Sequence, residues 1–209
     1  MAKAKELNII ICGVGGQGVV LMSEFLGNAA VKGGLEVKGS EVLGMAHRGG
    51  SVFSNLRLGR NAIAILTMEG KCDVLLAVEP SEALRNIHYL SKESVVVLNT
   101  REVKPFTVYL GKSGYPSPEE VLDRLNKAAS KLVTLDATQI ATEAGSAQST
   151  NVVMLGALYG TGLMPINDET MKGVITGRFK GKVGDINIRA FDMGCEAVQK
   201  QMKSAATSP

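Results

Sequence analysis

The stretch ICGVGGQGVVL, residues 11–21, decides how the first part of the chain folds. It joins an apolar run, residues 7–12, to a segment in which apolar side chains recur at helical spacing. Between them, Gly13, Gly15 and Gly18 match the pattern G-x-G-x-x-G. In this pattern glycine permits a tight turn, and the following helix offers unpaired N–H groups and the positive end of its dipole. We therefore expect a strand, a glycine turn and a helix over about residues 16–31.

The rest of the chain alternates between strand-like and helix-like segments. A second strand is expected near residues 35–38, followed by a glycine-rich loop. Ser81 and Ser117 are expected to cap the helices that follow them. Further strands are expected over residues 51–59, 73–80, 94–100, 106–110 and 131–137. Further helices are expected over residues 81–90, 118–129, 138–145, 152–163, 168–176 and 183–203.

Strands that alternate with helices predict an α/β protein. We expect three layers, with a mainly parallel sheet, helices on both of its faces and a Rossmann-like first unit. The sequence shows no internal repeat and no obvious linker. Residues 1–203 are therefore assigned to a single domain, and residues 204–209 to a flexible tail.

Composition and charge favour a soluble globular protein. The 209 residues are 45% hydrophobic and carry a net charge of +3, with basic residues spread along the chain. A nucleic-acid surface would concentrate them, so we expect no nucleic-acid partner. The longest apolar stretch, residues 152–164, is shorter than the ~18 residues that a membrane span needs. We interpret it as a buried helix and expect no membrane association.

Three cysteines, Cys12, Cys72 and Cys195, are widely spaced and form no C-x-x-C pair. This spacing gives no signature of an iron–sulfur cluster or structural zinc, so no metal ligands are predicted in this chain. Free thiols also suit a reducing compartment, so we expect the protein in the cytoplasm.

The glycine loop alone leaves three interpretations open. A dinucleotide site needs an acidic residue about 20 positions further on, and Glu36 and Glu41 are near that spacing. Neither lies cleanly at the end of the predicted strand, so NAD or FAD is only weakly supported. The loop is otherwise a site for a phosphate or another anion, or a turn that packs strand against helix without a ligand.

A second glycine-containing loop, GMAHRGGS over residues 44–51, holds polar groups suited to a site. His47 exchanges protons near neutral pH, and Arg48 can bind a carboxylate or phosphate through two hydrogen bonds. In a doubly wound fold this loop would lie beside the first one. A plain surface loop is the alternative. The sequence shows no Ser-His-Asp order, no H-E-x-x-H and no P-loop lysine, so no catalytic residues are predicted.

Gly156 and Gly160 lie four residues apart on the apolar stretch near the carboxyl end. This spacing predicts close packing against another helix, and a subunit interface is the alternative. The sequence therefore leaves open whether the isolated chain forms a homodimer.

Several stretches together resemble one known family. They are GVGGQGVVL, SEVLGMAHRGGSVFSNLRLG, AVEPSEALR, VVLNT, TNVVMLGAL and NIRAFDMG. The chain resembles the gamma subunit or gamma domain of 2-oxoacid:ferredoxin oxidoreductases over about residues 7–202. The second stretch is most similar to the version called the beta subunit of indolepyruvate ferredoxin oxidoreductase.

The resemblance implies an accessory but required subunit. Such enzymes oxidatively decarboxylate a 2-oxoacid, form an acyl-CoA and reduce ferredoxin. Thiamine diphosphate and the iron–sulfur clusters are expected on a larger partner subunit, and ferredoxin is reached through the complex. The isolated chain is expected to be inactive, and its glycine loop could face a phosphate of coenzyme A or the partner subunit near its thiamine site. The sequence does not name the 2-oxoacid.

The resemblance also implies which residues form the site. The expected cofactor-side or interface residues are Gly13, Gly15, Gly16, Gln17, Gly18, Arg48, Gly49, Gly50 and Ser51. His47 and Glu41 are expected to be auxiliary. Two alternatives remain, a free-standing NAD(P)-binding redox protein and a non-catalytic scaffold subunit with an empty glycine turn.

Overall fold

The computed structural model describes residues 6–44, 49–59 and 64–206. Its centre is a sheet of six strands in the order β2-β3-β1-β4-β5-β6. The strands are β1 Leu7–Val14, β2 Glu36–Leu43, β3 Ser51–Gly59, β4 Val74–Ala77, β5 Val95–Asn99 and β6 Lys131–Leu135. The helices are α1 Val19–Lys32, α2 Pro80–Arg85, α3 Phe106–Tyr109, α4 Pro118–Ala128, α5 Ala137–Ala144, α6 Thr150–Gly160, α7 Asp168–Arg178 and α8 Gly181–Ala206. Two 3-10 turns, Ile87–Tyr89 and Ala147–Ser149, precede β5 and α6.

The sheet is mainly parallel, as the alternation of elements predicts. Strands β1, β4, β5 and β6 pair in parallel, whereas β3 runs antiparallel to both β1 and β2. Strand β2 therefore points the same way as β1, but β3 separates the two. The first unit thus differs from a Rossmann unit, because β3 returns as a hairpin from β2 and pairs along all eight residues of β1.

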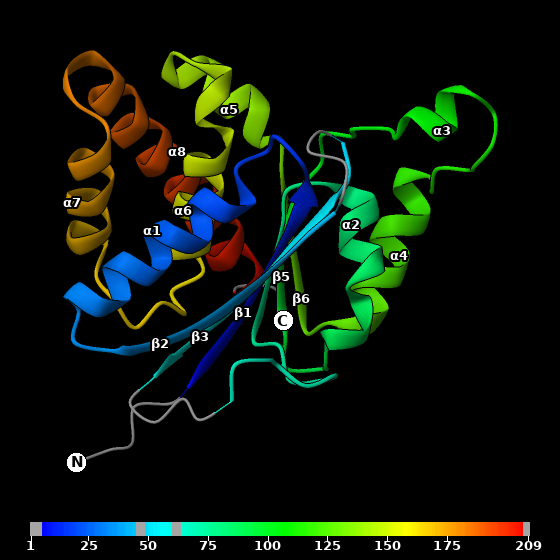
Figure 1. The fold of residues 1–209 in the computed structure, drawn as a ribbon, viewed down its shortest axis with the longest axis horizontal. Coiled ribbons are helices and arrows are strands. Elements are labelled where there is room, and N and C mark those ends of the chain that lie inside the picture. Colours follow the sequence, from blue (N-terminus) through cyan, green and yellow to red (C-terminus); the bar gives the residue numbers. More distant parts are fainter. Residues whose placement is uncertain (1–5, 45–48, 60–63, 207–209) are drawn as a thin grey trace.

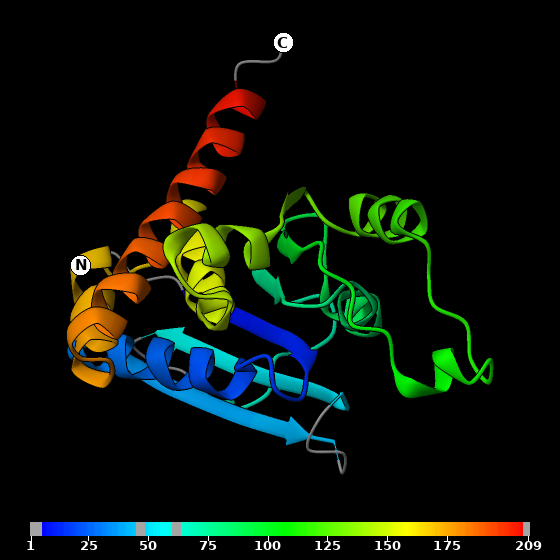
Figure 2. The same cartoon turned by 90° about the horizontal axis from the view of Figure 1, so that it is seen from above.

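Helices cover both faces of the sheet and make the predicted three layers (Figures 1 and 2). Helices α1, α5, α6, α7 and α8 lie on one face, and α2 and α4 lie on the other. Alternate residues of β1 point to opposite faces, so Ile9 and Ile11 pack in the core of the first face. Ile10 and Cys12 pack in the core of the second. Both faces of β1 are therefore buried, which explains its unbroken apolar sequence.

Helices α6 and α8 pack with their backbones in near contact, which confirms the prediction from the glycines of α6. A Cβ at Gly156 would lie 1.9 Å from the carbonyl oxygen of Phe191 on α8. A Cβ at Gly194 on α8 would lie 2.1 Å from the carbonyl oxygen of Val153. All residues of α6 after Thr150 are buried. The glycine spacing therefore serves packing within this chain.

Three local predictions were wrong. Strand β2 runs on to Leu43, where a loop was expected after residue 38, because residues 36–43 pair along the whole of β3. Residues 106–109 form the short helix α3 and not a strand, and they lie on a segment that extends away from the sheet (Figure 1). Helix α2 begins at Pro80 with Glu79 as its cap, so Ser81 is not the cap.

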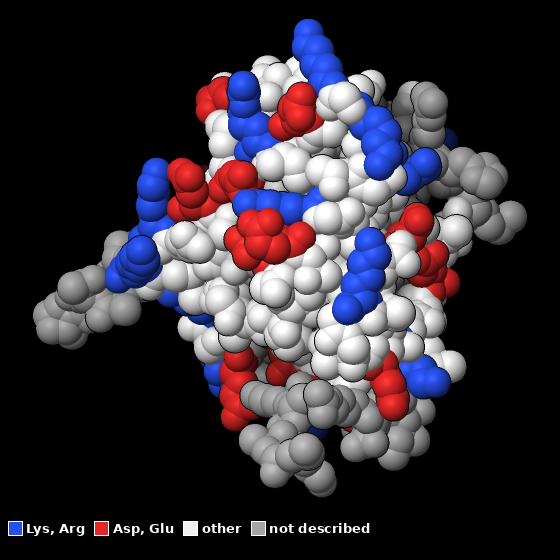
Figure 3. Space-filling model, turned by 90° about the vertical axis from the view of Figure 1, so that its left-hand side faces the viewer, with Lys and Arg blue, Asp and Glu red and all other residues white. Residues whose placement is uncertain are grey.

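The carboxyl end of the chain is helical further than expected. Helix α8 continues to Ala206, so the first three residues assigned to the tail belong to it, and residues 207–209 lie outside the described residues. None of the helices in the described part of the chain is long and apolar enough to cross a membrane. On the face drawn in Figure 3, lysine and arginine alternate with aspartate and glutamate and do not gather into a basic patch.

Candidate functional site

The two glycine loops meet at the carboxyl edge of the sheet. The N–H of Gly15 donates to the carbonyl of Gly50 at 2.8 Å, and the N–H of Gly49 donates to the carbonyl of Gly15 at 3.2 Å. Because β1 and β2 run in the same direction, the loops that follow them reach the same edge. The expected adjacency of the loops is therefore confirmed for Gly49, Gly50 and Ser51. His47 and Arg48 lie outside the described residues.

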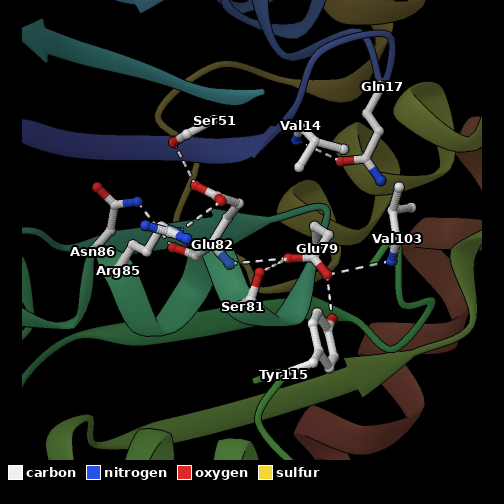
Figure 4. Close-up of polar contacts among 10 residues, drawn as sticks. All are labelled: Val14, Gln17, Ser51, Glu79, Ser81, Glu82, Arg85, Asn86, Val103 and Tyr115. Carbon is white, nitrogen blue, oxygen red and sulfur yellow. Dashed lines mark hydrogen bonds and ion pairs between the residues drawn. The ribbon is translucent and has the colours of Figure 1, made fainter. Parts of the chain in front are cut away.

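Gln17 closes the first loop from inside (Figure 4). Its Oε1 accepts from the N–H of Val14 at 2.8 Å, and its Nε2 donates to the carbonyl of Val78 at 3.4 Å, just beyond β4. A Cβ at Gly13 would lie 2.7 Å from that Oε1. Gly13 thus leaves room for the Gln17 side chain, which folds back over the end of β1 and holds the turn in shape.

The rest of the loop presents backbone N–H groups at the start of α1. Gly16 and Gly18 have φ angles of 99° and 78°, which favour glycine. The N–H groups of Gly16, Gly18 and Val19 have no acceptor within the described ranges. Helix α1 also has no side-chain cap and no acidic residue in its first turn. This end of the helix therefore attracts an anion.

A cleft of about 470 Å³ opens beside this end of α1. Gly15, Gly16 and Gly18 form its polar end. Its walls are mostly apolar and come from α1 and the ends of β2 and β3: Val19, Val20, Leu21, Leu43, Gly44 and Val52, with Val14 and Glu24. The cleft could therefore take a ligand that combines a phosphate with an apolar part.

The acidic residues that a dinucleotide would need are poorly placed. Glu36 is the first residue of β2, so it lies at the opposite edge of the sheet from the glycine loop. Glu41 is exposed on β2 opposite Ser54 and does not line the described part of the cleft. Glu24 of α1 lines it instead. The geometry gives the NAD interpretation no further support.

Ser51 links the second loop to a buried carboxylate that the sequence analysis did not single out. Its Oγ donates to Oε2 of Glu82 at 2.6 Å, and Arg85 Nε lies 3.0 Å from Oε1 of the same group. The Glu82 side chain is only 5% exposed. Burial raises the pKa of Glu82 above its usual range, while the Ser51 hydrogen bond and Arg85 oppose this rise.

Glu79, three residues earlier, is fully buried and accepts four hydrogen bonds (Figure 4). Two come from α2, from Ser81 Oγ at 2.6 Å and the N–H of Glu82 at 3.0 Å. The other two come from the hydroxyl of Tyr115 and the N–H of Val103, the latter at 3.3 Å. Glu79 therefore holds both ends of residues 103–115, the segment that carries α3, next to the start of α2.

A sequence signal for these carboxylates exists in hindsight. The letters EPSE begin two residues after the last residue of the buried strand β4, and residues at the carboxyl ends of parallel strands gather at the ligand-binding edge of such sheets. Asn99, at the end of neighbouring β5, also turns inward. It donates to the carbonyl of Val78 and accepts from the N–H of Ala137 at the start of α5, both at 3.0 Å.

Two of the three cysteines, Cys12 and Cys72, are buried where their thiols are unreactive. Burial raises the pKa of Cys12 well above its usual value, and it raises the pKa of Cys72 to about 12. Within the described residues, no three His, Cys, Asp or Glu side chains are grouped so that they could hold a metal ion.

Comparison with known proteins gives one consistent family. A family model described as pyruvate ferredoxin/flavodoxin oxidoreductase matches residues 8–197. The indolepyruvate oxidoreductase subunit IorB of Pyrococcus horikoshii is 42% identical over 199 residues, which cover 95% of this chain and 98% of the relative. The pyruvate/ketoisovalerate oxidoreductases common subunit gamma of Pyrococcus furiosus is 34% identical over 181 residues, which cover 85% of this chain and 89% of the relative.

Solved structures share the fold. The pyruvate oxidoreductase subunit PORC of Thermotoga maritima matches with a TM-score of 0.68 and 26% identity, over 92% of this chain and 96% of that one. A 2-oxoglutarate:ferredoxin oxidoreductase of Magnetococcus marinus, with 2-oxoglutarate, coenzyme A and succinyl-CoA bound, matches with a TM-score of 0.73 and 23% identity. This match covers 95% of this chain but 32% of the Magnetococcus chain, so the shared fold is one part of a longer polypeptide there.

Proposed function

The chain belongs to the pyruvate ferredoxin/flavodoxin oxidoreductase family, and from this membership we propose that it is the gamma-type subunit of a 2-oxoacid:ferredoxin oxidoreductase. The assembled enzyme would decarboxylate a 2-oxoacid, transfer the acyl group to coenzyme A and pass the electrons to ferredoxin. The observation that carries the proposal is the 42% identity over nearly the full length of a relative named as such a subunit.

The same comparison favours an arylpyruvate as substrate. The chain is 42% identical to an indolepyruvate oxidoreductase subunit and 34% identical to a subunit shared by pyruvate and ketoisovalerate oxidoreductases. The pocket that selects the 2-oxoacid would belong to the larger partner subunit.

Thiamine diphosphate and the iron–sulfur clusters fit the partner subunit better than this chain. The chain has only three cysteines, which are widely spaced, and no three His, Cys, Asp or Glu side chains of the described residues are grouped so that they could hold a metal ion. An iron–sulfur cluster is usually held by four cysteine thiolates. Ferredoxin would then be reduced through the complex.

Coenzyme A fits the cleft beside α1. The N–H groups of Gly16, Gly18 and Val19 would hold one of its phosphates, and the apolar wall formed by Val20 and Leu43 would contact the rest. When bound, coenzyme A supplies the thiol that accepts the acyl group. The residues of this chain would hold and orient it.

A scaffold subunit is the second candidate, because internal packing already accounts for two of the glycines. Gly13 makes room for Gln17, and Gly18 makes room for Asn151, whose side chain would meet a Cβ there. Gly16 differs, since nothing lies within 4 Å of a Cβ at that position. Its open side supports a ligand and not packing.

Co-purification tests the subunit proposal. The chain, tagged and expressed in its native anaerobic host, should bring down a larger subunit that carries thiamine diphosphate and iron–sulfur clusters. The complex should form acyl-CoA from an arylpyruvate faster than from pyruvate or 2-oxoglutarate, with reduction of ferredoxin. A lone chain that retains NAD(P) and supports no ferredoxin reduction would overturn the proposal.

A matched pair of variants separates ligand binding from scaffolding. Gly16→Ala and Gly162→Ala both place a side chain at a positive φ, 99° and 74°, with open space around it. Each should lower stability by about 1–3 kcal/mol through backbone strain. If the loop binds coenzyme A, only Gly16→Ala should raise the KM for coenzyme A while the complex stays assembled. Equal kinetics for both variants would favour the scaffold.

A further inference from the structure

Asn151 brings an unused hydrogen-bond donor to the glycine loop. It lies in the first turn of α6 and is 7% exposed. Its Oδ1 accepts from the N–H of Val152 at 3.0 Å, whereas its Nδ2 has no acceptor in the part of the chain that the structure describes. A Cβ at Gly18 would lie 2.7 Å from Nδ2, so the amide group lies close to the N-cap residue of α1.

An unpaired donor in such a place needs a partner. A donor on a mostly buried side chain is usually paired with an acceptor of the protein, a water molecule or a ligand. Two side-chain atoms in the described ranges are unpaired and fully enclosed, Asn55 Nδ2 and the Tyr159 hydroxyl, whereas Asn151 Nδ2 is not enclosed in this way and can be reached from outside. Asn151 differs from both because it lies at the mouth of a loop whose own N–H groups are also unpaired.

The positive ends of two helices meet at this place. Helices α1 and α6, of 14 and 11 residues, have no side-chain cap and no acidic residue in the first turn. By contrast, a side chain caps each of α2, α4, α5 and α7: Glu79, Ser117, Asp136 and Asn167. The two uncapped helix starts touch through Gly18 and Asn151, so their partial positive charges add up around the unpaired donors.

We propose that Asn151 is a ligand-binding residue, whose Nδ2 donates to an oxygen of a phosphate group held by the N–H groups of Gly16, Gly18 and Val19. This inference rests on the proposed function, in which the loop binds a phosphate of coenzyme A, and it adds a side-chain contact from α6. Since Oδ1 already accepts from Val152, the free part of the side chain can only donate, and a phosphate oxygen accepts.

Charge limits where the phosphate lies. Glu24, which lines the same cleft, is six residues beyond Gly18, or about 9 Å along α1 at 1.5 Å per residue. A phosphate at the glycine end avoids this carboxylate. The opposite orientation of the ligand would bring like charges together.

Asn151→Asp tests the donor without removing the side chain. Aspartate has nearly the same shape and keeps an oxygen for the N–H of Val152, but it replaces the donor with a negative oxygen. Asn167→Asp is the matched control, because Asn167 is exposed at the start of α7 and its Oδ1 accepts from the N–H of Thr170 at 2.8 Å. Both variants change the net charge by the same amount at a helix start.

The binding of pyrophosphate and of coenzyme A to the full-length chain would be measured by isothermal titration calorimetry. We expect both to bind the natural chain, and we expect Asn167→Asp to change the dissociation constants less than twofold. Asn151→Asp should weaken both at least tenfold, because a hydrogen bond to a charged group is lost and a repulsion is added.

A second measurement covers the case in which Asn151→Asp does not fold. In the natural chain, pyrophosphate should shift the side-chain amide resonances of Asn151 in a ¹⁵N–¹H spectrum and leave those of Asn167 in place. If pyrophosphate and coenzyme A both fail to bind the natural chain, the proposed phosphate site falls together with this inference. If they bind but Asn151→Asp binds equally well, or the Asn151 resonances do not move, only the role of Asn151 is overturned.

Discussion

Ser51 Oγ and Glu82 Oε2 lie 2.6 Å apart, although 31 residues separate them in the chain. This hydrogen bond joins the first residue of β3 to a buried carboxylate of α2. Gly49 and Gly50, just before Ser51, are bonded to Gly15. A continuous set of contacts therefore runs from α2 through the second loop to the glycine turn.

Ser51→Ala should destabilise the protein in a pH-dependent way. Burial raises the pKa of Glu82 above 4.5, so its stabilising contribution is complete below about pH 4.5 and is lost as the pH rises through the folded pKa. The hydrogen bond from Ser51 lowers the pKa of Glu82. Removing the Ser51 hydroxyl should therefore raise this pKa further and increase the stability that the protein loses as the pH rises. We expect a cost of about 1–3 kcal/mol in unfolding free energy at pH 7 and less at pH 4.5, measured by urea denaturation.

Ser113→Ala is the control for this experiment. Its hydroxyl is exposed and bonded to Thr107 at 2.8 Å, away from any buried carboxylate. The cost should stay within about 0.5 kcal/mol at both pH values. An equal pH dependence in both variants would contradict the role given to Glu82.

Tyr115→Phe should loosen the segment that carries α3. The Tyr115 hydroxyl donates to the buried carboxylate of Glu79, and its loss should cost about 1.5–3 kcal/mol. Hydrogen exchange of the amides in residues 103–113 should become faster, while the amides of β4 and β5 should keep their protection. Tyr109→Phe, at a side chain that is 74% exposed, should leave both stability and exchange unchanged.

Gly156→Ala should destabilise the protein severely. Its Cβ would lie 1.9 Å from the carbonyl oxygen of Phe191, so α6 and α8 would have to move apart. We expect a loss of more than about 3 kcal/mol or failure to fold, measured by thermal unfolding. Gly173→Ala is the matched control in α7, where nothing lies within 4 Å, and it should stabilise by up to about 1 kcal/mol.

The thiols should react in a fixed order with a thiol reagent at pH 8. Cys12 and Cys72 are buried with strongly raised pKa values, whereas Cys195 on α8 is half-buried and its pKa is raised less. We expect Cys195 to be modified slowly in the folded protein, and all three cysteines to be modified at once in guanidinium chloride. Rapid labelling of Cys12 in the native protein would contradict its placement in the sheet.

The sequence by itself determined the elements whose residues carry a local signal. The apolar run of β1, the glycine turn and the helical spacing of α1 follow from periods of two and 3.6 residues, and Ser117 with Pro118 marks the start of α4. The family also followed from the sequence, because the two glycine loops and the flanking stretches occur together. These signals lie within a few residues of the structure that they specify.

The tertiary structure decided what depends on contacts between distant segments. The position of β3 between β1 and β2, the full length of β2 and the helical form of α3 were not predictable locally, since strand pairing is set by the partner strand. The buried carboxylates of Glu79 and Glu82 and the unpaired amide of Asn151 were missed for the same reason. The sequence shows which polar groups a chain has, but only the folded chain removes them from water and leaves particular donors without a partner.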